Sequence, residues 1–577
     1  MFRARTLPQA LADAARSGEG YIFVEQGSET RRSYAEMYEN SARVARAFQE
    51  LGFRPGDLVA LIIPEAEPFL CALFGASIAG IVPASLYPPS ATVDLQHYIA
   101  ATAATLRFAR ARAVVTSARF VDAFNQWESS CPDLWLVIGH ETLHAQMHHA
   151  HRPTPAESCA HKVSVDDIAF VQFTSGSTSA PKGVAVSHRS LAANVEAING
   201  PAGLATCASD SAVSWLPLYH DMGLVGMALG AMYAGRPAVL MAPEVFVKRP
   251  AEWLRAISRY RGTVSFAPSF AYDLCVRRVK PRDLEGIDLS CWRVAGCGGE
   301  PIHAEALLAF AEAFRAVGFR ETSFVPSYGL AEHVLAATLA PLGRPIRVAH
   351  VSTGDGATPN NGILPESGPG EQVMIVSCGP PLPGHRLRIL DENGRSAPEE
   401  VIGEITLAGP SVMNGYYFDD DLTNEALRGG WLHTGDLGYV SEGELFVCGR
   451  IKDIVIVNGR KHHPHDLEWA VGELVGVRRG RVVAFGTMRM GAHDRVVIVA
   501  EPSGTVSAQI LTETIRHRIA AACGLHVDEV VLVPRGTIGR TTSGKPQRAA
   551  TKARYERGEF SAASSMLSSV RSRPPQE

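Results

Sequence analysis

Residues 168–183 read IAFVQFTSGSTSAPKG, in which a short apolar run leads directly into a loop rich in hydroxyl groups and glycine. Similar apolar, β-branched runs occur at 113–117 (AVVTS), 135–139 (WLVIG) and 237–241 (PAVLM). Longer helical patterns lie between such runs, for example AEALLAFAEAFRAVG at 304–318. This alternation is typical of βα units built around largely parallel sheets. The sequence therefore predicts an α/β fold.

The later parts of the chain differ in character. Residues 341–370 are rich in Gly, Pro, Asn and Ser with little periodicity, which predicts a surface insertion or loop. Residues 379–415 show short strands with turn signals, which indicates a small β-rich subdomain. Residues 451–560 show mixed strands and helices of their own, and from about residue 561 a disordered tail is expected. We expect an N-terminal domain over 1–450 with an insertion near 341–370, and a small α+β C-terminal domain over 451–577.

Composition excludes several classes of protein. The 55 basic and 59 acidic residues give a net charge of −4, which excludes a generally basic nucleic-acid binder. The uncharged stretch 68–93 is interrupted by Gly, Ser and Pro, so we expect a buried helix followed by a buried strand, with no stable membrane insertion. The N-terminal residues lack the apolar core of a secretory signal, and none of the ten cysteines forms a Cys-x-x-Cys pair. These features predict a cytoplasmic protein with reduced thiols.

Two glycine-containing clusters follow strand-like runs and could hold phosphate groups. Residues 174–183 offer backbone N–H groups, hydroxyls and the charge of Lys182 to phosphate oxygens. This loop is not a Walker A motif, because Pro181 stands where that motif requires glycine. The second cluster, 296–301, fails the dinucleotide fingerprint because Pro301 occupies its third glycine position. Each cluster alone could equally be a simple turn.

Together with five further stretches, these clusters resemble the core motifs of the adenylate-forming superfamily of acyl-CoA synthetases, peptide-synthetase adenylation domains and luciferases. The seven stretches occur in order over most of the chain. They are 174–183 (TSGSTSAPKG), 215–223 (WLPLYHDMG), 298–301 (GGEP), 327–332 (SYGLAE), 434–438 (TGDLG), 449–453 (GRIKD) and 541–545 (TTSGK).

The resemblance implies an ATP site with Mg²⁺ bound through oxygen ligands. Lys545 would bridge the α-phosphate and the substrate carboxylate and stabilise the charge that develops there. The implied catalytic residues are Lys545, Glu332 and Thr174, of which Thr174 and Glu332 would be the metal ligands. The implied nucleotide-binding set is Thr174, Ser175, Gly176, Ser177, Thr178, Lys182, Gly298, Gly299, Glu300, Pro301, Ser327, Tyr328, Gly329, Leu330, Ala331, Asp436, Arg450 and Lys545.

Individual roles also follow from the resemblance. The loop at 174–178 would hold the β- and γ-phosphates. Tyr328 would stack on the adenine, with Gly298, Gly299 and Glu300 lining the other side of the purine pocket. Asp436 would accept both ribose hydroxyls and Arg450 would donate to the same sugar.

Within the superfamily, the chain is most similar to fatty acyl-AMP ligases. Matching strings include SWLPLYHDMGL at 214–224, SYGLAEHVLAAT at 327–338 and GRKHHPHDLE at 459–468. Ser269 and Lys461 stand where this group usually has Asn. The loop-rich segment 341–370 lies where the group carries an insertion linked to loss of coenzyme A as the acceptor. The resemblance therefore implies that a fatty acid is activated as acyl-AMP and transferred to the phosphopantetheine thiol of an acyl carrier protein.

The same resemblance implies an acyl tunnel and a moving C-terminal lid. The tunnel would be reached past His220, Asp221, Met222 and Gly223, with Phe270 and Tyr272 near it. Lys452 matches the family's hinge position, where a few backbone angles can absorb a domain rotation. Two alternatives remain: an acyl-CoA synthetase, and a catalytically silent protein that binds acyl groups or nucleotides.

Overall fold

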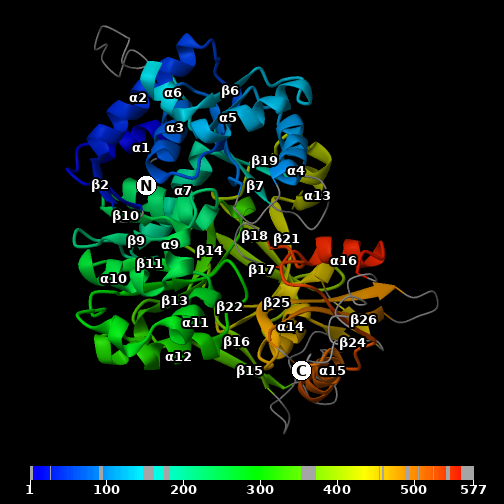
Figure 1. Cartoon of the computed structure of the whole chain (residues 1–577). Coiled ribbons are helices and arrows are strands. Elements are labelled where there is room, and N and C mark those ends of the chain that lie inside the picture. The colour runs from blue at the N-terminus through cyan, green and yellow to red at the C-terminus, as the bar shows by residue number, and fades with distance from the viewer. Residues whose placement is uncertain are drawn as a thin grey trace, which may run out of the picture.

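The computed structural model describes residues 4–25, 28–89, 95–146, 162–174, 182–352, 372–453, 455–457, 460–488, 494–504, 506–523, 525–540 and 546–560. Two large mixed sheets with helices on their faces, a smaller antiparallel sheet and a C-terminal unit make up the molecule (Figure 1). This arrangement confirms the predicted α/β class, with a large N-terminal domain and a small C-terminal one.

A seven-stranded sheet forms around the apolar run at 168–174. Strand β7 pairs in parallel with β4 and antiparallel with β8. Ala169, Phe170 and Val171 are all buried, because helices and neighbouring elements cover both faces of the sheet. The strand order is β19 (Gly415–Tyr416), β8 (Lys182–Ser187), β7 (Ile168–Thr174), β4 (Val82–Ser85), β3 (Leu58–Ile62), β5 (Ala113–Thr116) and β6 (Leu136–Gly139).

Within the uncharged stretch 68–93, a buried helix is followed by a buried strand, as the sequence predicts. Helix α3 (Ala66–Ile78) is buried and leads into the buried strand β4. Among the described residues, no helix has both the length and the apolar character needed to cross a membrane. The other helices of this half are α1 (Leu7–Ala14), α2 (Tyr34–Glu50), α4 (Leu95–Phe108), α5 (Ala118–Phe124), α6 (His140–Gln146) and α7 (His188–Asn199).

An eight-stranded sheet brings two of the sequence motifs to one edge. Strands β11, β12 and β13 run parallel to one another, so the carboxyl ends of β12 and β13 meet where residues 298–300 and 327–329 lie. The strand order is β14 (Ala336–Leu339), β13 (Phe324–Gly329), β12 (Val294–Cys297), β11 (Val264–Ala267), β9 (Ala212–Ser214), β10 (Ala238–Met241), β1 (Gly20–Glu25) and β2 (Ser28–Ser33).

Helices packed on this sheet enclose an aromatic core. Tyr272, Trp253 and Trp292 are fully buried, with ring centroids 5.1–6.4 Å apart. Phe310 packs edge-on to Tyr272 at 5.0 Å. Such pairs stabilise a core beyond the burial of apolar area alone. The helices are α8 (Gly230–Tyr233), α9 (Pro243–Lys248), α10 (Ala251–Arg259), α11 (Ser269–Arg278) and α12 (Ala304–Phe314).

The β-rich subdomain extends beyond the predicted range 379–415. Its antiparallel sheet contains β17 (Arg386–Leu390), β18 (Gly403–Ala408), β20 (Leu427–Arg428), β21 (Trp431–Ser441) and β22 (Glu444–Arg450), with α13 (Asp420–Ala426) beside it. The long strands β21 and β22 are therefore part of it.

The predicted loop at 341–370 needs a correction in its first part. Residues Val348–Ser352 form strand β15, which pairs antiparallel with β16 (Gln372–Val376) from Val348↔Val376 to Ser352↔Gln372. This strand forms because it pairs with a partner about twenty or more positions away, an interaction that local composition does not reveal. Residues 353–371, and with them most of the predicted insertion, lie outside the described residues, as does the predicted tail from 561.

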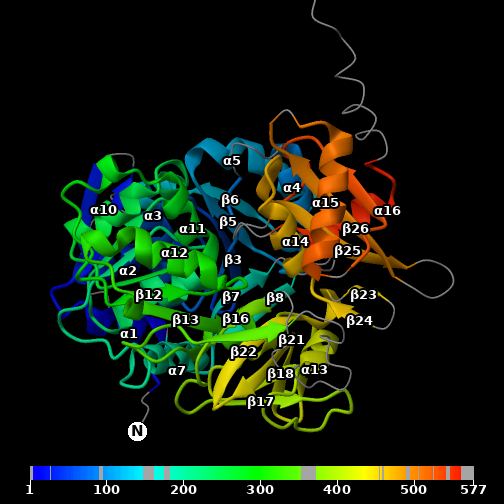
Figure 2. The same ribbon diagram turned by 90° about the horizontal axis from the view of Figure 1, so that it is seen from below.

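The C-terminal unit has a core of its own. Val496, Ile498 and Ile515 are fully buried between its sheet and helices. Figure 2 shows this unit beside the large domain, and Trp469 of α14 stacks on His303, which precedes α12, with ring centroids 3.6 Å apart. The elements are β23 (Val455–Val457), β24 (Arg460–His462), α14 (Pro464–Gly472), β25 (Val477–Met488), β26 (Asp494–Pro502), α15 (Ala508–Cys523), β27 (Glu529–Leu532) and α16 (Arg548–Glu556).

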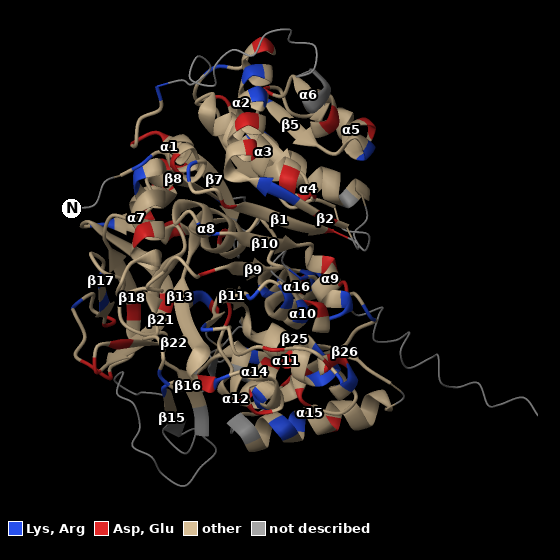
Figure 3. Cartoon of the chain, turned by 90° about the vertical axis from the view of Figure 1, so that its left-hand side faces the viewer, with Lys and Arg blue, Asp and Glu red and all other residues tan. Residues whose placement is uncertain are grey.

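Charges of both signs are interspersed over the face shown in Figure 3. This distribution fits the near-balanced composition.

Two histidines are buried inside the large domain. His188 is 1% exposed, and its Nδ1 accepts a hydrogen bond from the backbone N–H of Leu7 at 3.0 Å. His333 is fully buried with its Nδ1 3.0 Å from the carbonyl of Ala336. Burial lowers the pKa of His188 to about 4 and that of His333 to about 3, so both imidazoles are neutral at pH 7.

We expect stability to fall as the pH is lowered from 7 to 5. Below pH 6.5 the unfolded chain binds protons that the folded chain refuses, so stability is fully present above that pH and declines below it. By pH 5 each buried imidazole should cost about 2 kcal/mol of unfolding free energy. Denaturant unfolding across this range measures the slope. His333→Gln should flatten it, while His517→Gln, at an exposed position, should not; equal slopes in both variants would contradict this account.

Candidate active site

A buried carboxylate lies where the β-rich sheet meets the eight-stranded sheet. Asp436, on β21, is 6% exposed. Its Oδ2 accepts a hydrogen bond from the Tyr328 hydroxyl on β13 at 2.8 Å, and its Oδ1 accepts one from Nε of Arg450 on β22 at 2.8 Å. Charge-assisted bonds of this kind are among the strongest in proteins. The structure thus brings together three predicted nucleotide-binding residues from two different sheets.

Local structure fixes the orientation of Asp436. Asp436 and Arg450 are directly opposite in the β21–β22 pair. The backbone N–H of Asp436 donates to the Thr434 hydroxyl at 3.0 Å, and that hydroxyl donates to the carbonyl of Ile405 at 2.7 Å. Burial, together with the charge of Asp436, raises the pKa of Tyr328 well above its usual value, so its hydroxyl keeps the proton that it donates.

The glycine cluster after β12 packs tightly against the neighbouring motif. A Cβ on Gly298 would stand 2.5 Å from Oγ of Ser327, which itself donates to the carbonyl of Cys297 at 3.2 Å. Gly299 has φ +79°, a conformation that favours glycine, and a Cβ there would lie 3.5 Å from Cε of Met222. Pro301 is exposed at the end of the cluster.

Glu300 joins the predicted nucleotide and acyl sides of the site. Its Oε1 accepts a hydrogen bond at 2.7 Å from the backbone N–H of Phe270, at the start of α11. Phe270 is partly buried and packs edge-on to Trp215 with ring centroids 6.2 Å apart. Because Gly299 also faces Met222, two separate contacts connect the purine-side cluster to the predicted acyl residues.

A π-helix carries the other predicted acyl residues. It spans Met222–Leu229 and directly follows His220 and Asp221, whose carboxylate accepts from the backbone N–H of Met222 at 2.8 Å. A Cβ on Gly223 would stand 2.2 Å from the carbonyl oxygen of Pro217, so only glycine fits there. Wide turns of this kind are rare and frequently occur at functional sites.

Tyr272, the last predicted acyl residue, occupies a different environment. Its side chain is fully buried in the aromatic core, and its hydroxyl donates to the carbonyl of Gly296 at 2.8 Å. It therefore lies in the core and joins α11 to β12.

The predicted phosphate loop begins and ends on two paired strands. Thr174 and Lys182 are opposite each other in the β7–β8 pair, whereas residues 175–181 and the side chain of Thr174 lie outside the described residues. The ammonium group of Lys182 lies 5.6 Å from the centre of the Tyr416 ring. The Tyr416 hydroxyl donates to Oε1 of Glu332 at 2.7 Å. Tyr416 thus connects the end of the loop to the predicted metal ligand.

The remaining predicted residues lie at strand ends and in turns. Gly329 ends β13, and a Cβ there would clash with the carbonyl of Leu335 at 1.8 Å. Leu330 precedes a short 3₁₀ turn, Ala331–His333, that carries Glu332. Lys452 is exposed in the turn between β22 and the C-terminal unit, where a hinge residue is expected.

Lys545 lies outside the described residues, but its flanking residues are described. Arg540 and Pro546 pair as an isolated antiparallel bridge around 541–545. Burial lowers the pKa of Arg540, and the nearby Glu300 carboxylate acts in the opposite direction. Arg540 is therefore within electrostatic reach of Glu300.

Tyr416 and Thr434 are the two site residues that the sequence alone does not reveal. Tyr416 belongs to the short strand β19, whose pairing with β8 places it beside Lys182. Thr434 opens one of the quoted motifs but has no role until its contacts are known. The doublet Tyr416–Tyr417 after a glycine is the only signal in the sequence, and it is a weak one.

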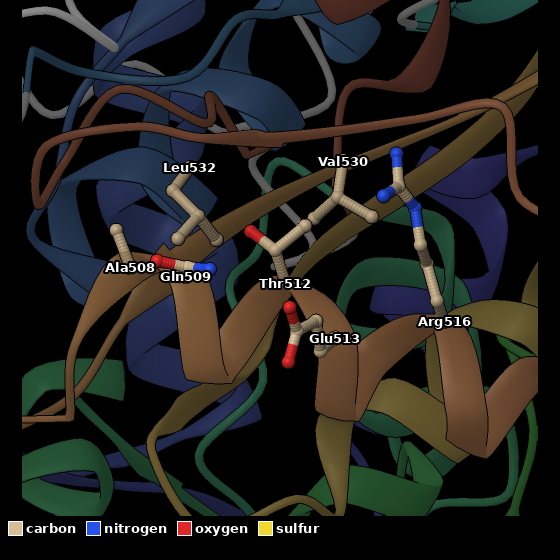
Figure 4. Close-up of a pocket in the computed structure, with 7 residues that line it drawn as sticks. All are labelled: Ala508, Gln509, Thr512, Glu513, Arg516, Val530 and Leu532. Atoms are coloured by element: carbon tan, nitrogen blue, oxygen red, sulfur yellow. The ribbon is translucent and has the colours of Figure 1, made fainter.

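A surface hollow of the C-terminal unit lies apart from these residues. Figure 4 shows it between α15 and β27, and none of the predicted site residues contributes to it. It is lined by Ala508, Gln509, Thr512, Glu513, Arg516, Val530 and Leu532.

The donor set suits a metal ion that a ligand helps to hold. Within the described part of the chain, no group of three or more His, Cys, Asp or Glu side chains could bind a metal. Glu332 nevertheless offers a carboxylate fixed by Tyr416. Mg²⁺ is commonly bound through one or two carboxylates plus substrate phosphates, so the residues present fit it.

Comparisons of the sequence with known proteins identify the family to which the chain is similar. The sequence profile of AMP-binding enzymes matches residues 11–417, and one described as the AMP domain of Disco-interacting protein 2-like proteins matches residues 452–565. A Caulobacter vibrioides protein named as an acyl-CoA synthetase is 34% identical over 96% of each chain. A medium-chain-fatty-acid–[acyl-carrier-protein] ligase of Moorena producens is 32% identical over 94% of this chain and 93% of the relative.

A comparison with solved structures identifies the same kind of enzyme. A structure from a study of fatty acyl-adenylate ligases of E. coli and L. pneumophila superposes with a TM-score of 0.89 at 35% identity, over 96% of this chain and 98% of that chain. The chain therefore belongs to the AMP-binding family of adenylate-forming enzymes and, within it, to the fatty acyl-AMP ligases.

Proposed function

We propose that the protein uses ATP to activate a fatty acid as its acyl adenylate and then transfers the acyl group to the phosphopantetheine thiol of an acyl carrier protein. One observation supports this proposal: contacts join the predicted purine side and the predicted acyl side into one site. The cluster 298–300 touches Met222 and Phe270, while Asp436 stands on the facing sheet, held by Tyr328 and Arg450. This arrangement would bring a nucleotide and an acyl carboxylate together in one site.

In the first half-reaction, a carboxylate oxygen of the fatty acid attacks the α-phosphorus of ATP. The new P–O bond forms as the bond to the β-phosphate oxygen breaks, and pyrophosphate leaves with that electron pair. Asp436 accepts hydrogen bonds from the ribose hydroxyls, and Arg450 and Tyr328 hold it in place. Lys545 neutralises the charge that develops between carboxylate and phosphate. Lys182 and the loop at 174–178 bind the departing phosphates.

Mg²⁺ would be held by Glu332, the Thr174 hydroxyl and the phosphates, and would neutralise phosphate charge when bound. Tyr416 donates to Oε1 of Glu332 and so fixes the orientation of that carboxylate.

In the second half-reaction, the thiolate sulfur attacks the acyl carbonyl. A thioester bond forms, and AMP leaves as the mixed anhydride breaks. The names of the relatives differ in the acceptor of the acyl group. One is named as an acyl-CoA synthetase and another as a ligase for an acyl carrier protein. The predicted insertion at 341–370 favours the carrier protein.

A direct assay distinguishes the acceptors. The protein is incubated with ATP, Mg²⁺ and fatty acids of six to eighteen carbons, with either coenzyme A or a holo acyl carrier protein added. We expect pyrophosphate release and acyl-AMP with a preferred chain length, because each buried CH₂ contributes about 0.8 kcal/mol. Acylated carrier should exceed acyl-CoA by at least about a hundredfold, the discrimination open to about 3 kcal/mol of differential binding. Comparable thioester yields with coenzyme A would support the acyl-CoA synthetase instead.

Lys545→Ala should cripple adenylate formation while leaving ATP binding largely intact. Removing a cation from a developing charge should lower the rate of ATP–pyrophosphate exchange about a hundredfold or more. Equilibrium binding of ATP, followed by calorimetry, should change little. Unchanged exchange in this variant would refute the role of Lys545.

Tyr328→Phe should weaken ATP binding by removing the donor to Oδ2 of Asp436. The buried carboxylate oxygen then loses its partner, at a cost of about 1–2 kcal/mol, so the KM for ATP should rise about five- to thirtyfold. Tyr439→Phe is the matched control, because its hydroxyl is buried on the same strand as Asp436 and has no hydrogen-bond partner among the described residues. Similar KM values in the two variants would count against the proposed position of the ribose.

A further inference from the structure

The chain turns sharply two residues after Glu332. Val334 has φ +66° and ψ −58°, and the backbone N–H of Leu335 donates to the carbonyl of His333 at 2.8 Å across it. These angles and this hydrogen bond define a γ-turn of the rare form with positive φ. A β-branched residue seldom adopts a positive φ, because its side chain then crowds the backbone. The folded chain therefore carries strain at Val334.

Packing alone does not account for this strain. The side chain of Val334 is 1% exposed and belongs to the main hydrophobic core, which explains an apolar residue but not the angles of its backbone. Strain of this kind lowers the equilibrium constant for folding by about five- to a hundredfold, and it persists only where the surrounding contacts impose it. Glycine would adopt the same angles without strain. The cause lies in the segments that flank Val334.

Glu332 lies near the tip of a short hairpin. Strands β13 and β14 are antiparallel neighbours, and residues 330–335 connect them. The backbone N–H of Leu330 donates to the carbonyl of Leu335 at 2.9 Å, which closes the two ends of the connection. Between them, the 3₁₀ turn Ala331–His333 leads away from β13, and the γ-turn leads back to β14. The γ-turn therefore sets where Glu332 stands relative to this sheet.

The base of the hairpin is fixed to α7. The side chain of Asn194, which is fully buried, donates from Nδ2 to the carbonyl of Ala336 at 2.8 Å and accepts at Oδ1 from the backbone N–H of the same residue at 3.2 Å. A Cβ on Gly329 would stand 1.8 Å from the carbonyl oxygen of Leu335, so the two strands approach closely at this end. These contacts prevent the hairpin from relaxing by a slide at its base.

The tip of the hairpin is fixed to a different part of the molecule. The backbone N–H of Met413 donates to the carbonyl of Glu332 at 2.9 Å, and the Tyr416 hydroxyl donates to its Oε1 at 2.7 Å. Tyr416 belongs to β19, which pairs with β8 of the seven-stranded sheet. Because the base is held by α7 and the tip is held from a second sheet, the contacts at both ends impose the γ-turn at Val334.

We propose that the γ-turn at Val334 is a positioning element of the metal site, which holds the Glu332 carboxylate where the cation of Mg²⁺–ATP binds. Val334 and Tyr416 are positioning residues, since they act through Glu332. The strain persists because a relaxed turn would let the carboxylate leave that place. This inference rests on the proposed function and adds to it the elements that fix the metal ligand.

The order of stability of two variants tests the strain. Val334→Ala keeps a Cβ and with it the strain, whereas Val334→Gly removes both, and both variants lose the branched side chain. At an ordinary position the glycine variant is the less stable of the two, because glycine has more conformational freedom in the unfolded chain. Here the unfolding equilibrium constant of Val334→Gly should be about three- to thirtyfold smaller than that of Val334→Ala, as measured by denaturant unfolding. A glycine variant less stable than the alanine variant would overturn the strain.

Binding of a metal–nucleotide complex tests the function of the turn. In Val334→Gly the carboxylate occupies its place for a smaller fraction of the time, so the apparent affinity should fall by that fraction. The dissociation constant for the Mn²⁺ complex of α,β-methylene-ATP, followed by water proton relaxation, should rise about three- to tenfold. Binding of the same analogue in EDTA should stay within about twofold of the parent protein. Equal affinity for the Mn²⁺ complex in variant and parent would overturn the proposal.

The kinetic counterpart is a split between half-saturation and maximal rate. In Val334→Gly, the Mg²⁺ concentration that gives half the maximal ATP–pyrophosphate exchange should rise about three- to tenfold, while the rate at saturating Mg²⁺ stays within about twofold of the parent. General damage to the fold would lower the rate at every Mg²⁺ concentration, and that result would overturn the proposal.

A second variant reaches the same carboxylate without changing the turn. Tyr416→Phe keeps the ring that lies 5.6 Å from the Lys182 ammonium and removes only the hydroxyl that donates to Glu332. It should weaken binding of the Mn²⁺ complex about three- to tenfold. Its matched control is Tyr417→Phe, because the ring of Tyr417 packs on Phe418 with centroids 4.2 Å apart. Equal losses in Tyr416→Phe and Tyr417→Phe would overturn the role of the hydroxyl.

Ala205→Gly controls for the introduction of glycine at a positive φ. Ala205 has φ +45° and is exposed in the loop after α7. The change should leave the affinity for the Mn²⁺ complex within about twofold of the parent protein. A loss as large as that of Val334→Gly would overturn the specific role of the γ-turn.

The unfolding and metal-binding measurements require no turnover, so they separate this inference from the proposed function. If the parent protein exchanged no pyrophosphate with any fatty acid, the proposed function would fail. The same measurements would still decide whether Val334 positions Glu332.

Discussion

The site depends on one carboxylate held between two sheets. Asp436 is nearly inaccessible to water, so its carboxylate needs donors on both oxygens. Tyr328 supplies one from the end of a parallel strand, and Arg450 supplies the other from the neighbouring antiparallel strand. If the two sheets moved apart, the buried carboxylate of Asp436 would lose the hydrogen bond from Tyr328. In the proposed function the same bonds also fix the acceptor of the ribose hydroxyls, so the stability of the junction and the placement of the nucleotide would have a single origin.

The connection between Glu300 and Phe270 has a similar double effect. It joins the glycine cluster to the first turn of α11, and so links the residues predicted to line the purine side and the acyl side of the site. If a longer acyl chain displaced α11, the hydrogen bond from Phe270 would move Glu300 and with it the purine-side cluster. Binding energy from the remote acyl tail can thereby reach the reacting centre.

Much of this arrangement could be predicted from the sequence, since it follows from strand topology. The motifs after β12 and β13 lie side by side because parallel strands end at the same edge, and the phosphate loop follows a buried strand as its apolar run indicates. Tyr416 could not be found in this way, because its contact with Glu332 depends on the pairing of the two-residue strand β19 with β8. Strand β15 escaped prediction for a related reason, as its partner lies beyond the loop-rich segment. The stack of His303 on Trp469 depends on how two domains meet, which no local pattern encodes.

The π-helix at Met222–Leu229 carries a consequence for the geometry of the acyl side. Its wider rings contain one residue more per hydrogen-bonded turn than an α-helix does. Loss of a single residue from this segment would restore regular winding and rotate the residues before the lost position by about 100° relative to the residues after it. Met222 would then turn away from Gly299, and the close approach of Gly223 to Pro217 would disappear. The length of this segment, counted to the residue, therefore sets how the residues predicted to line the acyl side are oriented.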